Sequence, residues 1–362
     1  MANRAINSVV AESVELLEQL IATPSFSREE NSAADLVERF LQRHTSGEVK
    51  RLHNNDYVHA SNFDPSLPTL LINSHLDTVR PVASYQRDPF APTREEGRLY
   101  GLGSNDAGAS VVALIAAYRC LEQKRLPYNL LLALSAEEEV MGEHGMRALL
   151  PALQAEFGQI DMALVGEPTG MRAAVGERGL VVMDCVARGV SGHAAREEGV
   201  NAIDKAMEDI KRLKKFRFER TSDLLGEIKM TVTQIQAGTQ HNVIPDECRF
   251  VIDIRTTDAY SNEQTVKIVQ ELLTSEAKER STRVHASAIA PNHPLVEAAA
   301  AVGCEMFISP TTSDMAILYD IPSLKMGPGD SARSHKADEY ILLSEIEEAV
   351  SLYLQFLEAL RV

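Results

Sequence analysis

Three continuous apolar runs constrain the fold of this chain most strongly. They are TLLINSHLDTV (69–79), NLLLALSA (129–136) and DMALVGE (161–167). Runs of this kind are typical of strands that are buried on both faces. The helix-length segment ASVVALIAAYRCLEQ (109–123) separates the first two runs. Strands that alternate with helices predict an α/β fold, in which helices cover both faces of a parallel sheet.

The pattern changes after about residue 175, where apolar and polar residues begin to alternate as in one-sided antiparallel strands. The predicted order is strand 179–189, helix 201–216, strands 227–238 and 247–257, helix 262–280 and strand 283–290. This β-α-β-β-α-β order matches a ferredoxin-like unit. The buried α/β pattern returns after about residue 291, so the small unit is predicted as an insertion in a larger domain.

Two local signals refine the helices. Ser27, followed by Glu30 three residues later, has the spacing of a capping box and predicts the start of the second helix. In MRALLPALQAEF, Pro151 predicts a broken helix, because proline removes a backbone donor.

Composition excludes several classes of partner. The 362 residues include 36 Lys and Arg against 52 Asp and Glu, which gives a net charge of −16. A negative protein is poorly suited to nucleic acid or to an anionic membrane surface. The N-terminal region has no long apolar run, and VVALIAAY (111–118) is too short to span a bilayer. We therefore expect a cytoplasmic protein of two domains whose four well-separated cysteines are reduced.

Polar residues interrupt the pattern where buried strands end. His75 and Asp77 end the first run on the same side of the strand, so Asp77 is placed to orient the imidazole of a metal-bound His75. A buried histidine satisfied by its neighbour is the alternative. Asp106, in the glycine-rich turn 101–108, is either a helix cap or a ligand. The acidic run 137–139 either faces a bound cation or lies solvated in a loop.

Two further residues follow the same rule, Glu167 after the third strand and His335 in a late loop. Two histidines and several carboxylates at the carboxyl ends of strands supply the mixed nitrogen and oxygen donors that suit zinc. A carboxylate that bridges two ions is feasible, and paired metals activate water against amides and esters. No cysteine is in this set, which argues against a structural zinc site.

Six motifs occur in order between about residues 70 and 340: SHLDTV, YQRDPFAPTREEGRLYGLGSNDAG, EEEVMGEHGM, VGEPTG, SGHAA and SHKADEY. They resemble the dinuclear-zinc amidohydrolases of the aminoacylase and carboxypeptidase-G type, which include acetylornithine deacetylase and succinyl-diaminopimelate desuccinylase. The resemblance implies a zinc-peptidase-type catalytic domain, 1–173 and 289–362, with helices on both faces of a mixed, mostly parallel sheet. It also implies that the inserted ferredoxin-like domain, 174–288, is a lid that dimerises.

The resemblance assigns two metal sites with one shared ligand. His75 and Glu167 would hold one ion, Glu139 and His335 would hold the other, and Asp106 would bridge both. The ions would be zinc, with cobalt as a second candidate.

The resemblance also assigns the proton transfer. The family pattern Glu-Glu-Val-x-Gly-x-x-Gly-Met fits residues 138–146 without a gap, which makes Glu138 the general base and Glu139 the ligand. The register one residue earlier would make Glu137 the base and Glu138 the ligand. Asp77 would orient His75.

Three lid residues match the family as well. His193 is similar to an oxyanion donor that acts in the partner's active site, and Asn242 and Arg255 resemble residues that bind substrate. A surface histidine at a turn, and an ion pair of Arg255 with Asp253 or Asp258, are the alternatives. Asp314 is either a buried acid near the metals or a helix cap.

The implied reaction is hydrolysis of a small N-acyl amino acid by a homodimer that forms through the lid. N-acetylornithine, of arginine synthesis, is the first candidate. The alternatives within the family are succinyl-diaminopimelate, succinylornithine, acetylcitrulline and small peptides.

A non-catalytic binding protein would lack some of the expected ligands, yet all are present. A serine hydrolase using Ser104 or Ser191 would need a G-x-S-x-G motif, which neither serine has.

Overall fold

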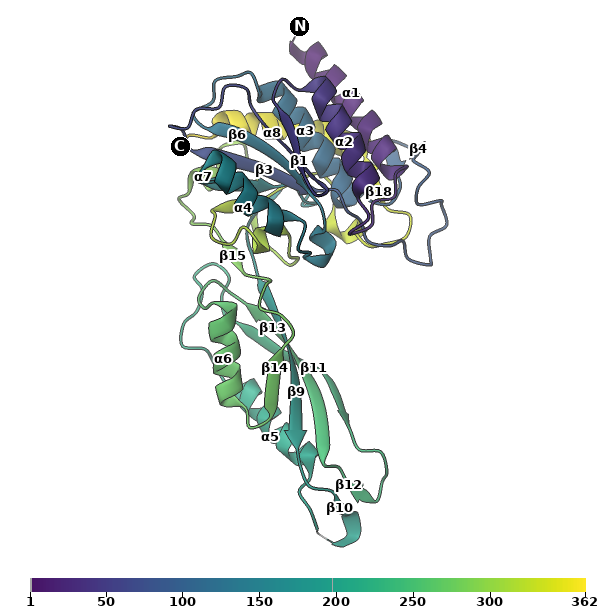
Figure 1. Cartoon of the computed structure of the whole chain (residues 1–362), viewed down its shortest axis with the longest axis vertical. Coiled ribbons are helices and arrows are strands. Elements are labelled where there is room, and N and C mark those ends of the chain that lie inside the picture. Colours follow the sequence, from purple (N-terminus) through teal and green to yellow (C-terminus); the bar gives the residue numbers. More distant parts are fainter. Residues whose placement is uncertain (1, 197) are drawn as a thin grey trace. The chain divides into compact units, whose positions relative to one another are not determined.

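The computed structural model describes residues 2–196 and 198–362, and the chain forms two compact units (Figure 1). The first unit runs to Gly176 and resumes over Ile289–Ser309 and Ser313–Val362. The second unit comprises Glu177–Ala288 together with Pro310–Thr312.

The first unit is built on a mixed sheet with the order β1-β2-β6-β3-β7-β17-β8, and β16 also pairs with β8. Its strands are β1 (Val49–Leu52), β2 (Asn55–His59), β3 (Thr69–His75), β6 (Asn129–Ser135), β7 (Met162–Val165), β8 (Ala173–Glu177), β16 (Met306–Ser309) and β17 (Ser323–Lys325). The four central strands, β6, β3, β7 and β17, are mutually parallel, whereas β1, β2 and β8 pair antiparallel with their neighbours. This confirms the predicted α/β class and the mostly parallel sheet.

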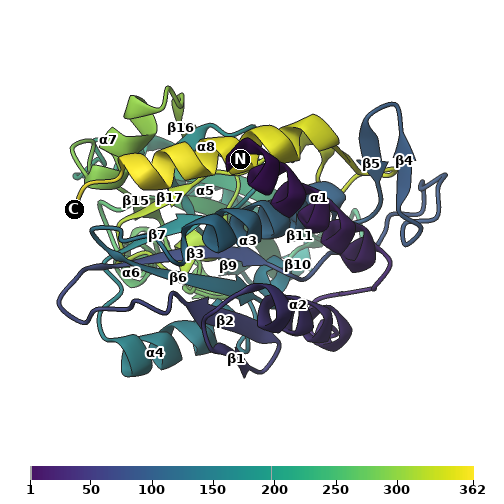
Figure 2. The same cartoon turned by 90° about the horizontal axis from the view of Figure 1, so that it is seen from above.

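Helices cover both faces of this sheet. They are α1 (Ala2–Ile21), α2 (Asn31–His44), α3 (Ala109–Leu121), α4 (Met146–Phe157), α7 (Pro294–Ala301) and α8 (Leu343–Ala359). Figure 2 shows α3 and α8 on one face and α4 on the other. Helix α3 is buried on nearly every side, because it lies between the sheet and the helices α1 and α8. On the opposite face, Leu149 and Leu153 of α4 pack with Leu71 and Leu131 of the sheet.

Two of the helix predictions need correction. Helix α4 continues through Pro151, because its apolar face stays packed on the sheet. Helix α2 begins at Asn31, and no capping box forms at Ser27 and Glu30. The Ser27 hydroxyl donates instead to Asp77, and the Glu30 carboxylate accepts from the amides of Arg28 and Glu137. Distant partners therefore outcompete the local cap.

The second unit contains a four-stranded antiparallel sheet with the order β11-β13-β9-β14, which is the strand order of a ferredoxin-like fold. Its strands are β9 (Gly179–Arg188), β11 (Lys229–Ala237), β13 (Glu247–Thr256) and β14 (Glu276–Glu279). Helices α5 (Ala202–Lys215) and α6 (Asn262–Leu272) pack on one face (Figure 1). The alternate residues of β9 and β13 face these helices, as the period of two predicts.

The end of this unit differs from the prediction. Helix α6 stops at Leu272 instead of 280, and β14, rather than 283–290, is the fourth strand. Of the predicted last strand only Ser287–Ala288 is extended into a strand, β15. The cause is Asp209 of α5, whose buried carboxylate accepts hydrogen bonds from the amides and hydroxyls of Thr274 and Ser275. These contacts hold a turn where the sequence pattern alone continues as a helix.

The remaining elements are short. A three-stranded sheet joins β18 (Tyr340–Leu342), β5 (Arg98–Tyr100) and β4 (Thr93–Glu95), and a two-stranded sheet joins β10 (Gly192–His193) and β12 (Val243–Ile244). The helical turns are η1 (Ser104–Gly108), η2 (Glu138–Val140), η3 (Ala194–Arg196), η4 (Asp314–Ala316) and η5 (Ser331–Arg333). Across the described residues, no helix combines the length and the apolar composition that crossing a bilayer requires.

Candidate metal centre

Parallel pairing brings four of the candidate residues to one edge of the first unit's sheet. His75 is the last residue of β3 and lies opposite Ser135, the last residue of β6. Glu138 and Glu139 follow β6 in the turn η2. Glu167 lies two residues beyond Val165, the end of β7, which pairs with Asn73 of β3. The carboxyl ends of these neighbouring strands therefore converge, as ligand sites of open α/β sheets do.

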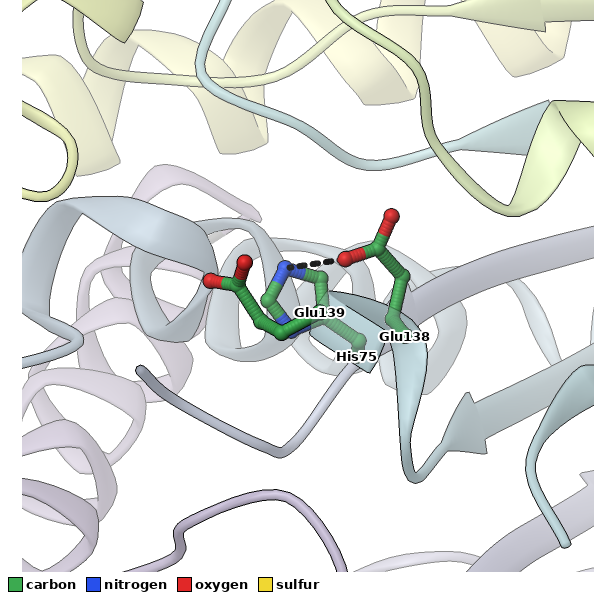
Figure 3. Close-up of side chains that lie close together, drawn as sticks. All are labelled: His75, Glu138 and Glu139. Carbon is green, nitrogen blue, oxygen red and sulfur yellow. Dashed lines mark ion pairs between the residues drawn. The ribbon is translucent and has the colours of Figure 1, made fainter. Parts of the chain in front are cut away.

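The His75 imidazole lies at the centre of a group of carboxylates. Its Nε2 atom lies 3.3 Å from Asp106 Oδ1, 3.6 Å from Glu167 Oε1 and 3.9 Å from Glu138 Oε2. Figure 3 shows His75 between the side chains of Glu138 and Glu139. The other ring nitrogen, Nδ1, lies 2.9 Å from the backbone oxygen of Asp77. When Nδ1 carries the ring hydrogen and donates it to that carbonyl, the lone pair of Nε2 can face a cation.

The His335 imidazole forms a second group. Its Nε2 atom lies 3.1 Å from Glu139 Oε1 and 3.7 Å from Asp106 Oδ2. Asp106 therefore turns one oxygen to His75 and the other to His335. Candidate ligand atoms lie within 4.8 Å of one another in three groups: His75–Asp106–Glu167, Asp106–Glu139–His335 and His75–Glu138–Glu139. The first two, called the two ligand groups below, are the sets that the family resemblance assigns to two ions, with Asp106 as the shared member.

Asp77 holds the acidic turn in place. Its buried carboxylate accepts from the amide of Glu138 at 3.0 Å, from the amide of Glu139 at 3.1 Å and from the hydroxyl of Ser27 at 2.7 Å. Its Oδ1 atom is also 3.5 Å from Nδ1 of His75. Asp77 thus contacts Glu138, Glu139 and His75 of the cluster. The sequence predicted only the contact with His75.

The Glu137 side chain points away from this cluster. Its Oε2 atom accepts from the amide of His144 at 3.3 Å, and a Cβ atom added to Gly142 would lie 1.8 Å from that oxygen. The Glu137 side chain therefore packs against Gly142 and His144 of its own loop, whereas Glu138 and Glu139 face the histidines. This geometry favours the register with Glu138 as base and Glu139 as ligand.

The electrostatics of the cluster favour bound cations. Burial raises the pKa of Glu138 well above its usual value, and raises the pKa of Glu167 to about 8. Burial opposes ionisation of Asp106 as well, but hydrogen bonding to His75 holds its pKa below the usual value. At His335, the hydrogen bond with Glu139 raises the pKa to about 9. A divalent ion in each group relieves the repulsion among so many carboxylates.

The donor set fits this interpretation. Each group combines one imidazole nitrogen with two carboxylates. The groups differ in burial, because the side chain of His75 is 1 % exposed and that of His335 is 54 % exposed. Nitrogen and oxygen donors of this kind suit zinc and similar divalent ions.

Asp314 lies beside the same cluster. Its Oδ2 atom accepts from the hydroxyl of Ser135 at 2.6 Å, while Ser313 supplies the side-chain cap of η4. Burial raises the pKa of Asp314 to about 6, although the hydrogen bond from Ser135 and the charge of His75 lower it. The structure thus places Asp314 as a buried acid near His75 and gives the cap to its neighbour.

The sequence model of the family described as Peptidase family M20/M25/M40 matches residues 71–359. The chain belongs to this family. The M20 membership and the paired ligand groups together identify the chain as a metal-dependent hydrolase.

Relatives and solved structures align with nearly the whole chain. It is 28 % identical to a succinyl-diaminopimelate desuccinylase of Verminephrobacter eiseniae, and the alignment covers 96 % of each chain. The aminopeptidase PepT of Bacillus cereus superposes with a TM-score of 0.76 at 18 % identity, over 97 % of this chain and 98 % of PepT. The Bacillus subtilis protein YXEP, described as a dinuclear metal-binding M20 peptidase, gives 0.72 at 17 % identity, over 98 % of each chain. At this identity the superpositions show the shared fold.

The M20 lid candidates lie in the second unit. His193 and Asn242 are exposed neighbours, because His193 of β10 pairs with Val243 of β12 and the amide of Ala194 donates to the carbonyl of Asn242 at 3.0 Å. Arg255 of β13 makes a bidentate ion pair with Asp253, with nitrogen–oxygen distances of 2.8 and 3.0 Å. The ion pair that the sequence offered as an alternative is therefore present.

Sequence reasoning missed two residues of this M20 centre. The spacing of Ser27 and Glu30 predicts a helix cap, but the Ser27 hydroxyl donates to Asp77. The motif SHKADEY assigns no role to Glu339, yet Glu339 is 3 % exposed and accepts hydrogen bonds from the loop that carries Asp106. A glutamate four residues after His335 was the available signal, but spacing alone does not show which backbone amides a carboxylate reaches.

Proposed function

We propose that this chain hydrolyses the amide bond of an N-acyl amino acid, and that N-succinyl-diaminopimelate is the first candidate substrate. The observation that carries the hydrolytic chemistry is the Asp106 carboxylate, which is shared by the two ligand groups. The candidate substrate rests on relatives that align over nearly the whole chain and bear the name succinyl-diaminopimelate desuccinylase.

This order of candidates reverses the one drawn from the sequence. N-acetylornithine was the first expectation, and the relatives found support the desuccinylase alternative instead. An N-acetylornithine deacylase of arginine synthesis, a succinylornithine or acetylcitrulline deacylase and a dipeptidase therefore remain as secondary candidates.

The proposed metal ligands are the five residues of the two groups: His75, Asp106, Glu139, Glu167 and His335. We propose zinc as the metal, with cobalt as a second candidate. When bound, the two ions supply Lewis-acid chemistry, in which a water molecule becomes acidic near neutral pH and the substrate carbonyl is polarised.

Glu138 is the proposed proton carrier. Its side chain is 10 % exposed, its Oε2 atom lies 3.9 Å from His75 Nε2, and the hydrogen bond from its own amide to Asp77 fixes its backbone. The raised pKa that burial causes suits a group that takes a proton from water and returns it to the leaving amine.

The lid residues are proposed to complete the reaction. His193 would donate a hydrogen bond to the oxyanion, and Asn242 and Arg255 would bind the carboxylate end of the substrate. To do so Arg255 would exchange its ion pair with Asp253 for the substrate carboxylate. We further propose that the protein is a homodimer that forms through the lid.

The test is release of free amine by the zinc-loaded protein from a matched panel. The panel holds N-succinyl-diaminopimelate, N-acetyl- and N-succinylornithine, N-acetylcitrulline and several dipeptides, each with and without a chelator. Chelator-sensitive turnover that is fastest for N-succinyl-diaminopimelate supports the proposal. Faster turnover of another member moves the substrate to that member, and turnover that survives complete metal removal contradicts the mechanism.

A further inference from the structure

Glu339 is a buried acid of the first unit that the proposed reaction leaves without a role. It lies directly before strand β18, four residues after His335, and it is 3 % exposed. A buried carboxylate is costly unless it is hydrogen-bonded, so its partners indicate what it does.

The three amides that the Glu339 carboxylate binds lie in one loop. Its Oε2 atom accepts from the amide of Gly103 at 3.0 Å, and its Oε1 atom accepts from the amides of Asn105 and Asp106, both at 2.9 Å. Its backbone carbonyl accepts from the amide of Gly101 at 3.0 Å. Four hydrogen bonds to one residue therefore hold the segment that leads into Asp106.

The loop needs these acceptors, because its conformation is irregular. Asp106 lies inside η1 with φ −121° and ψ 99°, far from helical values. Gly103 has φ +74°, and a Cβ atom there would lie 2.6 Å from Cγ2 of Thr78. Backbone amides that are buried without an acceptor destabilise the fold. Glu339 supplies acceptors that regular secondary structure does not.

We infer that Glu339 is a positioning residue of the metal centre, which fixes the Asp106 carboxylate between the two ligand groups by holding the amides of Gly103, Asn105 and Asp106. The inference rests on the proposed role of Asp106 as the shared ligand. Since one carboxylate then serves two ions, displacement of Asp106 weakens both sites together. Loss of a residue that orients a ligand typically lowers metal affinity 10- to 100-fold.

The adjacent residue provides a matched control. Asp338 Oδ1 accepts from the amides of Gln86 and Arg87 at 3.0 and 2.9 Å, the same kind of contact to a loop that holds none of the proposed ligands. Asp338 has φ +53°, a conformation that asparagine also tolerates, so Asp338→Asn preserves the backbone.

The experiment titrates metal-free wild type, Glu339→Gln, Asp338→Asn and Asp106→Asn with Co²⁺. Calorimetry gives the affinities, visible absorption reports the coordination of the ion, and the thermal midpoint of each metal-free protein reports folding. We expect Glu339→Gln to bind both ions about 10- to 100-fold more weakly, with a changed Co²⁺ spectrum. Asp338→Asn is expected to match wild type in affinity and spectrum.

A folded Glu339→Gln variant with wild-type affinities and spectrum overturns the inference. If Glu339→Gln does not fold, Glu339→Asp takes its place, because the shorter side chain keeps the charge but does not reach all three amides. Weaker binding of both ions then supports the inference, and unchanged binding overturns it. If Asp106→Asn binds both ions as tightly as wild type, the proposed role of Asp106 is wrong. If Asp106→Asn binds the ions more weakly but Glu339→Gln binds them as wild type does, only the proposed role of Glu339 is wrong.

Discussion

At the scale of single residues, the centre depends on carboxylates that bind backbone amides. Asp77 accepts from the amides of Glu138 and Glu139, and Glu339 accepts from the amide of Asp106. The residue types and their order along the chain carried the family resemblance, so the candidate ligands were predictable. These amide contacts were not, because they join segments tens to hundreds of residues apart and leave no local spacing signal.

The first prediction concerns the general base. Glu138→Ala is expected to retain two metal ions per chain and to lower kcat at least about 100-fold, the scale of lost general-base catalysis. Metal content by mass spectrometry and amine release measure the two effects. Glu143→Ala, which changes an exposed acid of the same loop, serves as the control and is expected to leave kcat unchanged. Wild-type turnover in Glu138→Ala would contradict the assignment of Glu138 as the general base.

The second prediction concerns Asp77. Asp77→Asn replaces one acceptor oxygen by a donor that faces an amide N–H, so the turn that carries Glu138 and Glu139 loses its anchor. We expect metal affinity to fall about 10- to 100-fold. Ser27→Ala removes one hydrogen bond from the same carboxylate and is expected to have a smaller effect in the same direction. Equal metal affinities in wild type and Asp77→Asn would contradict this role.

At the scale of elements, periodicity predicted most strands and helices but not where each ends. The buried strands β3, β6 and β7 and the alternating strands β9 and β13 follow their sequence patterns. Helix α6 ends before its pattern does, because Asp209 on another helix captures the amides of Thr274 and Ser275. A contact between residues 65 or more positions apart is invisible to a local pattern.

The third prediction is a pH dependence at this turn. Burial opposes ionisation of Asp209, but the hydrogen bonds from Ser275 and Thr274 together outweigh it and lower the pKa. A lowered pKa contributes stability above the unfolded value of about 3.9, and this stability is lost as the pH falls through the folded value. Asp209→Asn is expected to lower the free energy of unfolding by about 1–3 kcal/mol at pH 7.

Urea unfolding of wild type and Asp209→Asn at pH 7 and at pH 3 measures the effect. The difference in midpoint is expected to shrink at the lower pH, because below the unfolded pKa of about 3.9 the unfolded carboxylate takes up a proton that the hydrogen-bonded native carboxylate resists. Asp204→Asn, at an exposed residue in the first turn of α5, is the control and is expected to change the midpoint less than Asp209→Asn does. If the difference in midpoint between wild type and Asp209→Asn stays constant or grows at pH 3, the pKa of Asp209 is not lowered in the folded protein.

At the scale of the whole molecule, the second unit carries the surface proposed for dimerisation. Strand β11 is at an edge of its sheet, and most of its residues are exposed, including Ile235 at 55 %. An exposed edge strand with apolar residues favours pairing with a second chain. The sequence predicted the ferredoxin-like unit from its pattern, whereas the strand that lies at the edge, and is proposed as the dimer surface, is known only from the topology.

The fourth prediction tests whether His193 acts across the dimer. His193→Ala and Glu138→Ala are each expected to be folded and poorly active as homodimers. If His193 serves the partner's site, a mixed dimer of the two variants contains one complete site, so an equimolar mixture with random exchange regains up to about a quarter of the wild-type turnover. Amine release after mixing measures this gain. A mixture with no gain, in which light scattering of tagged chains shows exchange, would place His193 in the site of its own chain.

The most direct test of the account is the position of bound metal. Crystals of the zinc-loaded protein, measured at the zinc absorption edge, locate each ion from its anomalous scattering. We predict two peaks about 3.5–4 Å apart, one contacted by His75 and Glu167, the other by Glu139 and His335, with Asp106 between them. A single peak, or peaks that lie away from Asp106, would contradict it.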